Sequence, residues 1–325
     1  MFGHGSTSEN NPYESALDCG ACGGNHGLVS ARVLAQMANK KEVRRKLLTK
    51  GINIPDDAWF VAALHNTTTD ELSLYDLDHI PSTHIFYIDR LRNGLLAASR
   101  LCAQERLPTL QLKPQPREPA EAYREVERNA MDWSQVRPEW GLSRNAYMVI
   151  GRRSLTKEMS LEGRSFLHSY DYRLDPMQRL LENILTGPLV VAQWINMEHY
   201  FSTVDNEKFG SSSKVYHNVA GRFGVMTGGL SDLRTGLPSQ TVLDKGLPYH
   251  EPLRLITLIE APLEHARRAV ESVVTVKNLV LNDWIRLLVI DPEKQNVYTY
   301  NNGQWNAQSL SDAHEPLVEK EYSAQ

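Results

Sequence analysis

The sequence predicts an α/β fold in which a largely parallel sheet carries flanking helices and irregular, loop-rich insertions. Three observations favour this class. Short, continuous apolar segments, which are typical of buried parallel strands, alternate with segments of helical periodicity. A strand, a helix and a further strand follow one another between residues 253 and 290. The chain has 325 residues, of which 41% are apolar, so its size suits about two globular domains.

Helical periodicity is clearest along residues 28–48, where apolar side chains recur at helical spacing. Gly51 follows this segment as a helix C-terminal glycine would. Similar spacing predicts helices over the segments 91–105, 120–131, 180–200 and 262–278. Gly187 and Pro188 interrupt the third of these, because a proline inside a helix removes a backbone hydrogen bond.

Short apolar runs predict the strands. These runs cover residues 59–64, 85–88, 147–150, 253–259 and 285–290. Two stretches rich in Gly, Ser and Asn, residues 3–27 and 204–236, are the expected loop-rich insertions.

Prolines divide the chain into three parts. Residues 107–119 contain four prolines and precede a charged helix, so residues 107–145 are predicted to be a linker with one helix. Residues 1–106 then form a first α/β portion. Residues 146–325 form a second α/β portion that packs on the first.

Composition excludes several classes of protein. Lys plus Arg is 35 and Asp plus Glu is 39, which gives a net charge of -4, so a nucleic-acid partner is not expected. The longest apolar runs fall well short of the roughly 20 residues that a membrane-spanning helix needs. Three cysteines in a chain of this length do not form a disulfide framework and suit a reducing cytosol.

The N-terminal loop contains the strongest candidate for a metal site, formed by His4, Cys19, Cys22 and His26. Thiolate sulfur and imidazole nitrogen are the ligands that zinc prefers in proteins. Redox chemistry at the Cys-x-x-Cys pair is one alternative, and cysteines without a special role are another. A Gly-rich loop normally follows a strand, and here only Met1 and Phe2 precede it. We therefore expect the chain to be the C-terminal part of a longer protein.

His65 and Asp70 follow the strand predicted over residues 59–64. The carboxyl ends of parallel strands are where α/β proteins place their functional sites. We expect these two side chains to position the metal ligands without binding the metal themselves. A hydrogen-bonded turn without a functional role is the plainer alternative.

Long and unusual motifs run through the chain. They read GHGS, NNPY, SALDCGACGG, WFVAALHNTTTD, VRPEWGL, FLHSYD, QWIN, YFSTVD, SDLRTGLPSQ and HEPLRL, from residue 3 to residue 255. In these motifs, and over nearly all of its length, the chain resembles the DabA family. That family is the zinc subunit of bacterial energy-coupled complexes that accumulate inorganic carbon, CO2 and bicarbonate.

The resemblance implies a zinc site and core similar to those of β-carbonic anhydrases, with Cys, Asp, His and Cys as ligands. Carried over to this sequence, the His is His4 and the second Cys is Cys19, with Cys22 as the alternative. The first Cys and the Asp belong to a Cys-x-Asp-x-Arg motif, and no Cys-x-Asp occurs in this chain. Residues 1–106 would then be the C-terminal part of the zinc-site core and would hold half of the site.

The resemblance also implies a function for the intact protein. Zinc lowers the pKa of bound water from about 16 to about 7, and the resulting hydroxide attacks CO2 to give bicarbonate. A membrane-embedded, ion-translocating partner (DabB-like) would drive this hydration. The protein would lie peripherally on the cytoplasmic side of the inner membrane. This chain alone is expected to be inactive as an enzyme, and a non-catalytic docking or scaffold domain for the membrane partner is the alternative.

Overall fold

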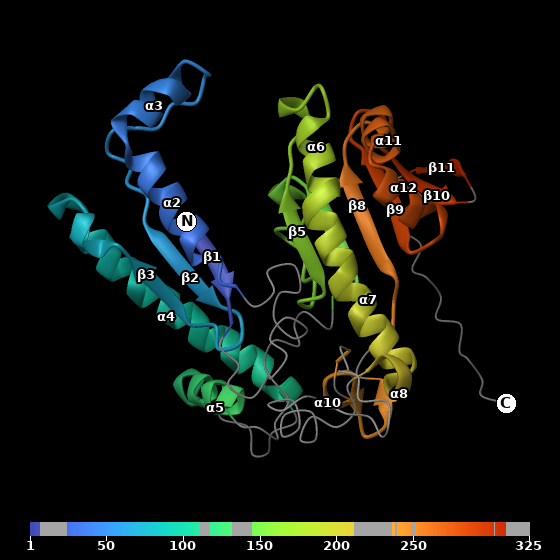
Figure 1. Ribbon diagram of the computed structural model, residues 1–325, viewed down its shortest axis with the longest axis horizontal. Helices are drawn as coiled ribbons and strands as arrows, with labels where there is room; N and C mark the ends of the chain where they lie inside the picture. The colour runs from blue at the N-terminus through green and yellow to red at the C-terminus, as the bar shows by residue number, and fades with distance from the viewer. Residues whose placement is uncertain are drawn as a thin grey trace. The chain divides into compact units, whose positions relative to one another are not determined.

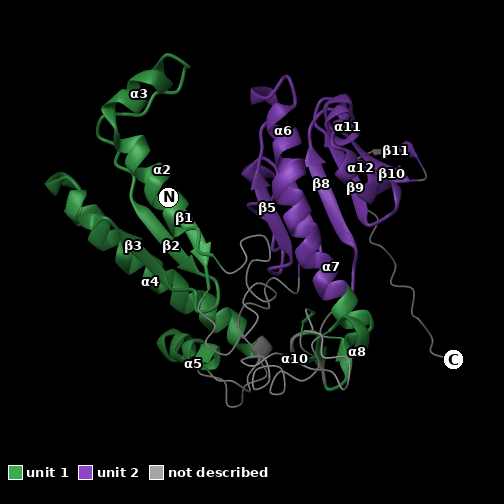
Figure 2. Ribbon diagram, viewed as in Figure 1, with its two compact units in different colours: residues 1–140, 201–249 green, residues 141–200, 250–325 purple. Residues whose placement is uncertain are grey.

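The computed structural model describes residues 1–6, 25–110, 118–131, 145–210, 236–237, 239–248, 251–301 and 303–309 (Figure 1). Contacts divide the chain into two compact units, which Figure 2 distinguishes. Unit 1 comprises residues 1–140 and 201–249, and unit 2 comprises residues 141–200 and 250–325. Unit 2 is therefore assembled from two separate stretches of the chain. The domain boundaries that the sequence suggests after residues 106 and 145 stay predictions.

In its described residues, unit 1 is built on a three-stranded sheet with the order β1-β2-β3. The strands are β1 (Phe2–Gly5), β2 (Ala62–Asn66) and β3 (Leu72–Tyr75). β1 runs parallel to β2, whereas β3 runs antiparallel to β2. Helix α2 (Leu28–Asn39) contacts β1 and β2, and its small buried residues Ala31 and Ala35 allow a close approach to the sheet.

Unit 1 also contains several helices and a short hairpin. The helices are α3 (Lys41–Leu48), α4 (Ile85–Arg106), α5 (Pro119–Met131), α8 (Asn206–Phe209) and α10 (Ser239–Val242). The 3-10 turns are η1 (Leu77–His79), η2 (Ser82–His84) and η3 (Leu107–Leu110). The hairpin consists of β6 (Leu243–Asp244) and β7 (Leu247–Pro248). α4 packs on α5 through the buried residues Ala103, Leu107, Ala122 and Val126.

The described residues of unit 2 form a six-stranded sheet with the order β11-β10-β9-β8-β4-β5. The strands are β4 (Tyr147–Gly151), β5 (Ser165–Ser169), β8 (Leu255–Glu260), β9 (Ile285–Asp291), β10 (Asn296–Asn301) and β11 (Gln304–Ser309). β5, β4, β8 and β9 are mutually parallel, and β10 and β11 extend the sheet as an antiparallel pair. The parallel strands therefore follow the order second, first, third and fourth along the chain, which is typical of one class of doubly wound sheets.

Helices of unit 2 cover one face of this sheet. They are α6 (Arg179–Ile184), the π-turn η7 (Leu185–Leu189), α7 (Val190–Val204), α11 (Leu263–Ser272) and α12 (Val274–Leu281). The last four residues of α7 belong to unit 1. Short 3-10 turns η5 (Arg153–Leu155) and η6 (Tyr172–Leu174) follow β4 and β5. α11 contacts both α6 and β9, which places these helices on the same side. The core between sheet and helices buries side chains such as Ile150, Leu181, Leu255 and Ile285.

The prediction of a largely parallel sheet is wrong in detail, because the two larger sheets of the described residues are mixed. The fold is α/β, as expected, but β3, β10 and β11 pair antiparallel with their neighbours. The continuous apolar runs used for the prediction identify only strands that are buried on both faces. β10 reads Asn-Val-Tyr-Thr-Tyr-Asn and is half-buried along most of its length, so it lacks that signal.

Several predicted elements are confirmed, and others are corrected. The helix expected over residues 262–278 is two helices, α11 and α12, and the segment 3–27, expected to be a loop, begins with part of β1. The strands expected over residues 147–150, 253–259 and 285–290 are β4, β8 and β9. The strand expected over residues 85–88 is instead the first turn of α4, and its Phe86 and Tyr87 are exposed. An apolar run of four residues cannot distinguish a strand from a helix.

The helix expected over residues 28–48 is broken at Lys40, whose backbone is extended with ψ of 127°. Tertiary hydrogen bonds cause the break. The Asn39 side chain exchanges two hydrogen bonds with the backbone of Phe60, at 2.8 and 2.9 Å. Arg44 donates to the Ala58 carbonyl oxygen at 2.6 Å.

Candidate functional site

The edge strand β1 and its neighbour β2 bring two predicted histidines side by side. Parallel pairing places His4 opposite His65 and Gly5 opposite Asn66. Residues paired across parallel strands present their side chains on the same face of a sheet. His4 is exposed and the His65 side chain is 38% exposed, so both imidazoles reach the surface of the sheet.

Glycines allow the start of α2 to lie directly against β1. The Gly27 N–H donates a hydrogen bond to the His4 carbonyl oxygen at 2.8 Å. A Cβ atom on Gly3 would lie only 2.3 Å from the Gly27 carbonyl oxygen, and one on Gly5 would lie 2.9 Å from Cγ of His26. Any larger residue at these two positions would push the segment away. This close approach brings His26 to the strand that carries His4.

The turn between β2 and β3 fixes the orientation of His65. His65 Nε2 lies 3.0 Å from Asp70 Oδ1, and the Arg106 guanidinium lies 3.0 Å from Asp70 Oδ2. Arg106 also donates hydrogen bonds to the carbonyl oxygens of Thr67 and Thr68, at 3.4 and 3.0 Å. The carboxylate of Asp70 thus bridges an imidazole from the sheet and a guanidinium from α4.

Backbone hydrogen bonds make this turn rigid. The Ser99 hydroxyl on α4 donates to the Asp70 carbonyl oxygen at 2.6 Å, and the Asp70 N–H donates to the Asn66 carbonyl oxygen at 2.8 Å. The Thr67 N–H donates to the Gly5 carbonyl oxygen at 2.8 Å, which ties the turn to the end of β1. Asp70 has a φ of +62°, a region where Asn and Asp are the most tolerated residues after glycine.

The geometry gives the two nitrogens of His65 separate tasks. A carboxylate accepts hydrogen bonds, so Nε2, which faces Asp70, carries the proton of the neutral ring. Nδ1 is then an acceptor and can take up a proton or ligate a metal ion. Carboxylates commonly orient histidines in this way around metal centres. The arrangement therefore suits proton transfer or metal binding next to His4.

The described residues contribute only part of the zinc site that the sequence predicts. Imidazole donors such as those of His4 and His65 fit zinc in kind. No group of three or more His, Cys, Asp or Glu side chains that could hold a metal ion occurs in the described part of the chain. Cys19 and its alternative Cys22 lie outside the described residues. Zinc binding and the choice between these cysteines stay predictions.

The sequence does not predict two residues of this site. Arg106 and Ser99 belong to α4 and reach Asp70 from far along the chain. No local pattern signals either of them, because an Arg and a Ser on a helix are ordinary surface residues. The tertiary contact between α4 and the β2–β3 turn is what recruits them.

Cys102 also lies on α4, close enough to Asp70 for an electrostatic interaction. Partial burial raises the pKa of the Cys102 thiol, and the negative charges of Asp70 and Glu105 raise it further. The thiolate is the form that ligates metal and attacks electrophiles, so this protonated thiol is poorly suited to either role near neutral pH.

Comparison with known proteins identifies close relatives of this chain. A protein of Thiobacillus denitrificans named probable inorganic carbon transporter subunit DabA is 66% identical over 99% of this chain. A protein of Nitrosomonas eutropha with the same name is 63% identical over the whole chain, and one of Aquifex aeolicus is 55% identical over 94% of it. The chain spans about 31% of the length of the first two relatives.

A match to a family model identifies the family of this chain. No solved structure matches this chain. Among the helices of the described residues, none is both long and apolar enough to cross a membrane. The family model described as probable inorganic carbon transporter subunit DabA matches residues 1–285. The chain therefore belongs to the DabA family.

Proposed function

We propose that this chain forms part of the zinc-binding, carbonic-anhydrase-like subunit of an inorganic carbon transporter, in which CO2 is hydrated to bicarbonate. Membership of the DabA family supports the transport role, because relatives are named as probable inorganic carbon transporter subunits. The pairing of His4 with His65 across β1 and β2 carries the chemical part of the proposal. It puts a candidate metal ligand beside an imidazole that a carboxylate orients.

His4 and Cys19 are the proposed zinc ligands in this chain, and Cys22 is the alternative to Cys19. Because no Cys-x-Asp sequence occurs in these 325 residues, we assign the remaining Cys and Asp ligands to a portion of the protein outside this sequence. When bound, zinc would make hydroxide available near neutral pH for attack on CO2.

His65 is the proposed proton acceptor of the site. Its Nδ1 would take the proton that hydration of CO2 to bicarbonate releases, while Asp70 holds Nε2 and prevents the ring from turning. Arg106 holds the second carboxylate oxygen of Asp70 and so keeps the carboxylate in place. His65, Asp70 and Arg106 therefore act as one unit, and loss of Asp70 or Arg106 frees the imidazole.

The wider proposal concerns fold and partners. The parallel pair β1–β2, with His4 near its carboxyl end, is the element that suits a β-carbonic-anhydrase-like core. The word subunit in the names of relatives supports a multi-protein assembly. We assign the partner role to a membrane-embedded, ion-translocating protein similar to DabB. The assembly would then hold this chain peripherally on the cytoplasmic side of the inner membrane.

Metal content and carbon uptake test the ligand assignment. His4→Ala and Cys19→Ser are introduced into the complete protein, expressed with its membrane partner, and zinc is measured by mass spectrometry. Both variants are expected to lose zinc and growth on low CO2, because loss of one ligand opens a four-ligand site. Cys22→Ser and His26→Asn are the matched controls and are expected to retain both. Zinc retained by His4→Ala and Cys19→Ser would overturn the assignment, and loss in Cys22→Ser alone would transfer it to Cys22.

A non-catalytic docking domain is the second candidate. Exposed apolar side chains on α2 and α4, among them Val29, Val33, Phe86 and Tyr87, favour it. The two functions are separable by the His65→Gln variant of the complete protein. A docking domain would keep normal carbon uptake in this variant, whereas a proton-accepting His65 requires a lower rate with the zinc content unchanged.

A further inference from the structure

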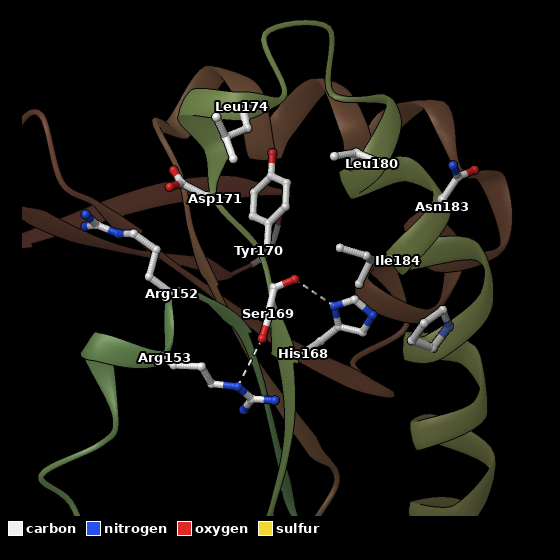
Figure 3. A pocket seen from close by; sticks show the side chains of 11 residues that line it. Arg152, Arg153, His168, Ser169, Tyr170, Asp171, Leu174, Leu180, Asn183 and Ile184 are labelled. Carbon is white, nitrogen blue, oxygen red and sulfur yellow. Dashed lines mark hydrogen bonds between the residues drawn. The ribbon is translucent and has the colours of Figure 1, made fainter. Parts of the chain in front are cut away.

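Unit 2 contains a cavity of about 660 Å³ next to the carboxyl ends of β4 and β5 (Figure 3). This volume is in the range of small-molecule sites, roughly 300–1,000 Å³. Ligands of doubly wound sheets bind at the carboxyl ends of parallel strands. The cavity is lined by residues of unit 2, whereas His4, His65 and Asp70 belong to unit 1.

The point where strand order reverses, between β4 and β8, is closed to a ligand. The buried Glu260 accepts a hydrogen bond from the Arg152 N–H at 2.8 Å and pairs with the Arg152 guanidinium. A Cβ atom on Gly151 would lie 2.9 Å from Cβ of Glu260, so the Glu260 side chain fills the space next to the end of β4. The cavity opens instead on the far side of β4, between the end of β5 and helix α6.

The walls of the cavity are apolar and preformed. Leu174 of η6 and Leu180 of α6 line it and are 77% and 52% exposed, so they present free apolar surface. Asp175 connects the segment after β5 to helix α6. Its carboxylate accepts hydrogen bonds from the Tyr170 hydroxyl at 3.2 Å and from the Leu181 N–H at 3.0 Å. The π-turn η7, which contributes Pro188, is of a kind that is frequent at functional sites.

Among the residues that the structure describes, the charges at the rim leave one cation without an ionic partner. Arg152 is paired with Glu260, and the Arg173 guanidinium forms two hydrogen bonds with Asp171. Arg153 donates only to neutral acceptors, Ser169 Oγ at 3.1 Å and the Leu167 carbonyl oxygen at 3.0 Å. Within the described residues no carboxylate pairs with Arg153. An anion is the complementary group for its guanidinium.

The outer edge of β5 is not the binding surface, because one side chain from η5 and one from β5 cover it. The Tyr170 N–H donates to Gly151 of β4, so the alternate residues Leu167 and Ser169 direct their carbonyl oxygens outward. The Arg153 guanidinium donates to the Leu167 carbonyl oxygen, and Nδ1 of His168 lies 3.1 Å from the Ser169 carbonyl oxygen. A peptide strand cannot pair there without displacing both, which leaves the cavity itself as the place for a ligand.

We propose that this cavity binds an amphipathic monoanion, a molecule with one carboxylate and an apolar body. The carboxylate pairs with Arg153 at the rim. The apolar body lies between Leu174, Leu180 and Ile184, beside the His168 ring, which Figure 3 shows directed toward Ile184. Burial of apolar area supplies most of the affinity, and the single cation selects the sign of the charge.

Calorimetry of the full chain with octanoate, octylamine, 1-octanol and acetate tests this proposal. Octanoate is expected to saturate one site and to bind at least tenfold more tightly than octylamine or acetate. Acetate lacks the apolar body, and octylamine carries the wrong charge. Equal binding of octanoate and 1-octanol would overturn the proposal, because the cation would then contribute nothing. Absence of saturable octanoate binding would overturn it as well.

Three variants locate the site. Arg153→Gln is expected to weaken octanoate binding about tenfold, as loss of a charge-assisted hydrogen bond does, and to leave 1-octanol unchanged. Leu180→Asp puts a carboxylate into a half-exposed wall and is expected to abolish octanoate binding. Arg254→Gln is the matched control, since Arg254 also bonds a backbone carbonyl but precedes β8 at the opposite end of the sheet. The assignment would be refuted if Arg254→Gln reduced octanoate binding as much as Arg153→Gln does. If Arg153→Gln fails to fold, Arg153→Lys keeps the charge and must retain discrimination against octylamine.

Discussion

Asp70 offers a clean test of how the β2–β3 turn holds His65. Its carboxylate is 16% exposed and bonds to His65 and Arg106, each at 3.0 Å. Its backbone has a φ of +62°. Substitution can separate these two properties. Asn removes the charge and tolerates positive φ, Gly removes the carboxylate and tolerates positive φ, and Ala removes the carboxylate and is strained there.

The expected costs follow from the contacts. Loss of hydrogen bonds to a charged group lowers the free energy of unfolding by about 2 kcal/mol, so Asp70→Asn and Asp70→Gly should each cost about that amount. Asp70→Ala adds the cost of the left-handed conformation, about 1 kcal/mol more. Ala is ordinarily the more favourable residue, so a greater loss with Ala than with Gly is a specific signature of positive φ.

Hydrogen exchange in increasing urea, read on peptides from β2 and β3, measures these differences. A global optical signal would mix the responses of the two units. Asp78→Asn is the control, because Asp78 forms an exposed pair with His79 and should cost less than about 0.5 kcal/mol. An Asp70→Ala variant as stable as Asp70→Gly would refute the backbone argument. An Asp70→Asn variant no less stable than Asp78→Asn would refute the role of the carboxylate.

Three further predictions concern other titratable groups. Glu260→Gln should lower the free energy of unfolding of unit 2 by about 2–3 kcal/mol, measured in urea. Glu264→Gln, which breaks an exposed ion pair, should lower it by less than about 0.5 kcal/mol. Equal costs would contradict the importance of the buried carboxylate of Glu260. Burial raises the pKa of Glu198 to about 8, above its value in the unfolded chain, so its protonated form stabilises the fold at low pH and that contribution is lost between about pH 4.5 and pH 8. Glu198→Gln should therefore flatten the pH dependence of unfolding in that window, and an unchanged profile would contradict the burial. Asp70→Asn should speed alkylation of Cys102 by iodoacetamide at pH 7.5, measured peptide by peptide, because one of the charges that raise the thiol pKa is removed; an unaltered rate would show that the two groups do not interact.

The sequence predicted the elements whose signal is local. β4, β8 and β9 are short apolar runs, and the helices α4 and α5 show helical spacing over most of their lengths. The β10–β11 hairpin was missed although Gly303, with φ of +80°, closes it and follows an asparagine in the sequence. Asn-Gly between alternating residues is a strong hairpin signal, so this hairpin is predictable from the sequence alone.

Burial explains the other errors in the fold. Strand β3 is half-buried throughout, and edge strand β1 alternates between exposed and half-buried residues. Such strands are held by pairing with a neighbour and not by their own hydrophobicity, so a single segment of sequence does not identify them. The break at Lys40 has the same origin, because partners near residue 60 decide it.

The candidate site divides in a similar way. Residue types and motifs alone pointed to His4, His65 and Asp70, and the long motifs pointed to the DabA family. Only the tertiary structure put His4 in register with His65 and recruited Arg106 from α4 to the carboxylate of Asp70. Strand pairing and ion pairs join residues that are distant in sequence, and no local pattern encodes which distant partner will meet them. The cavity beside Arg153 is the extreme case, since its walls come from a strand end and a helix that become a binding surface only when they pack together.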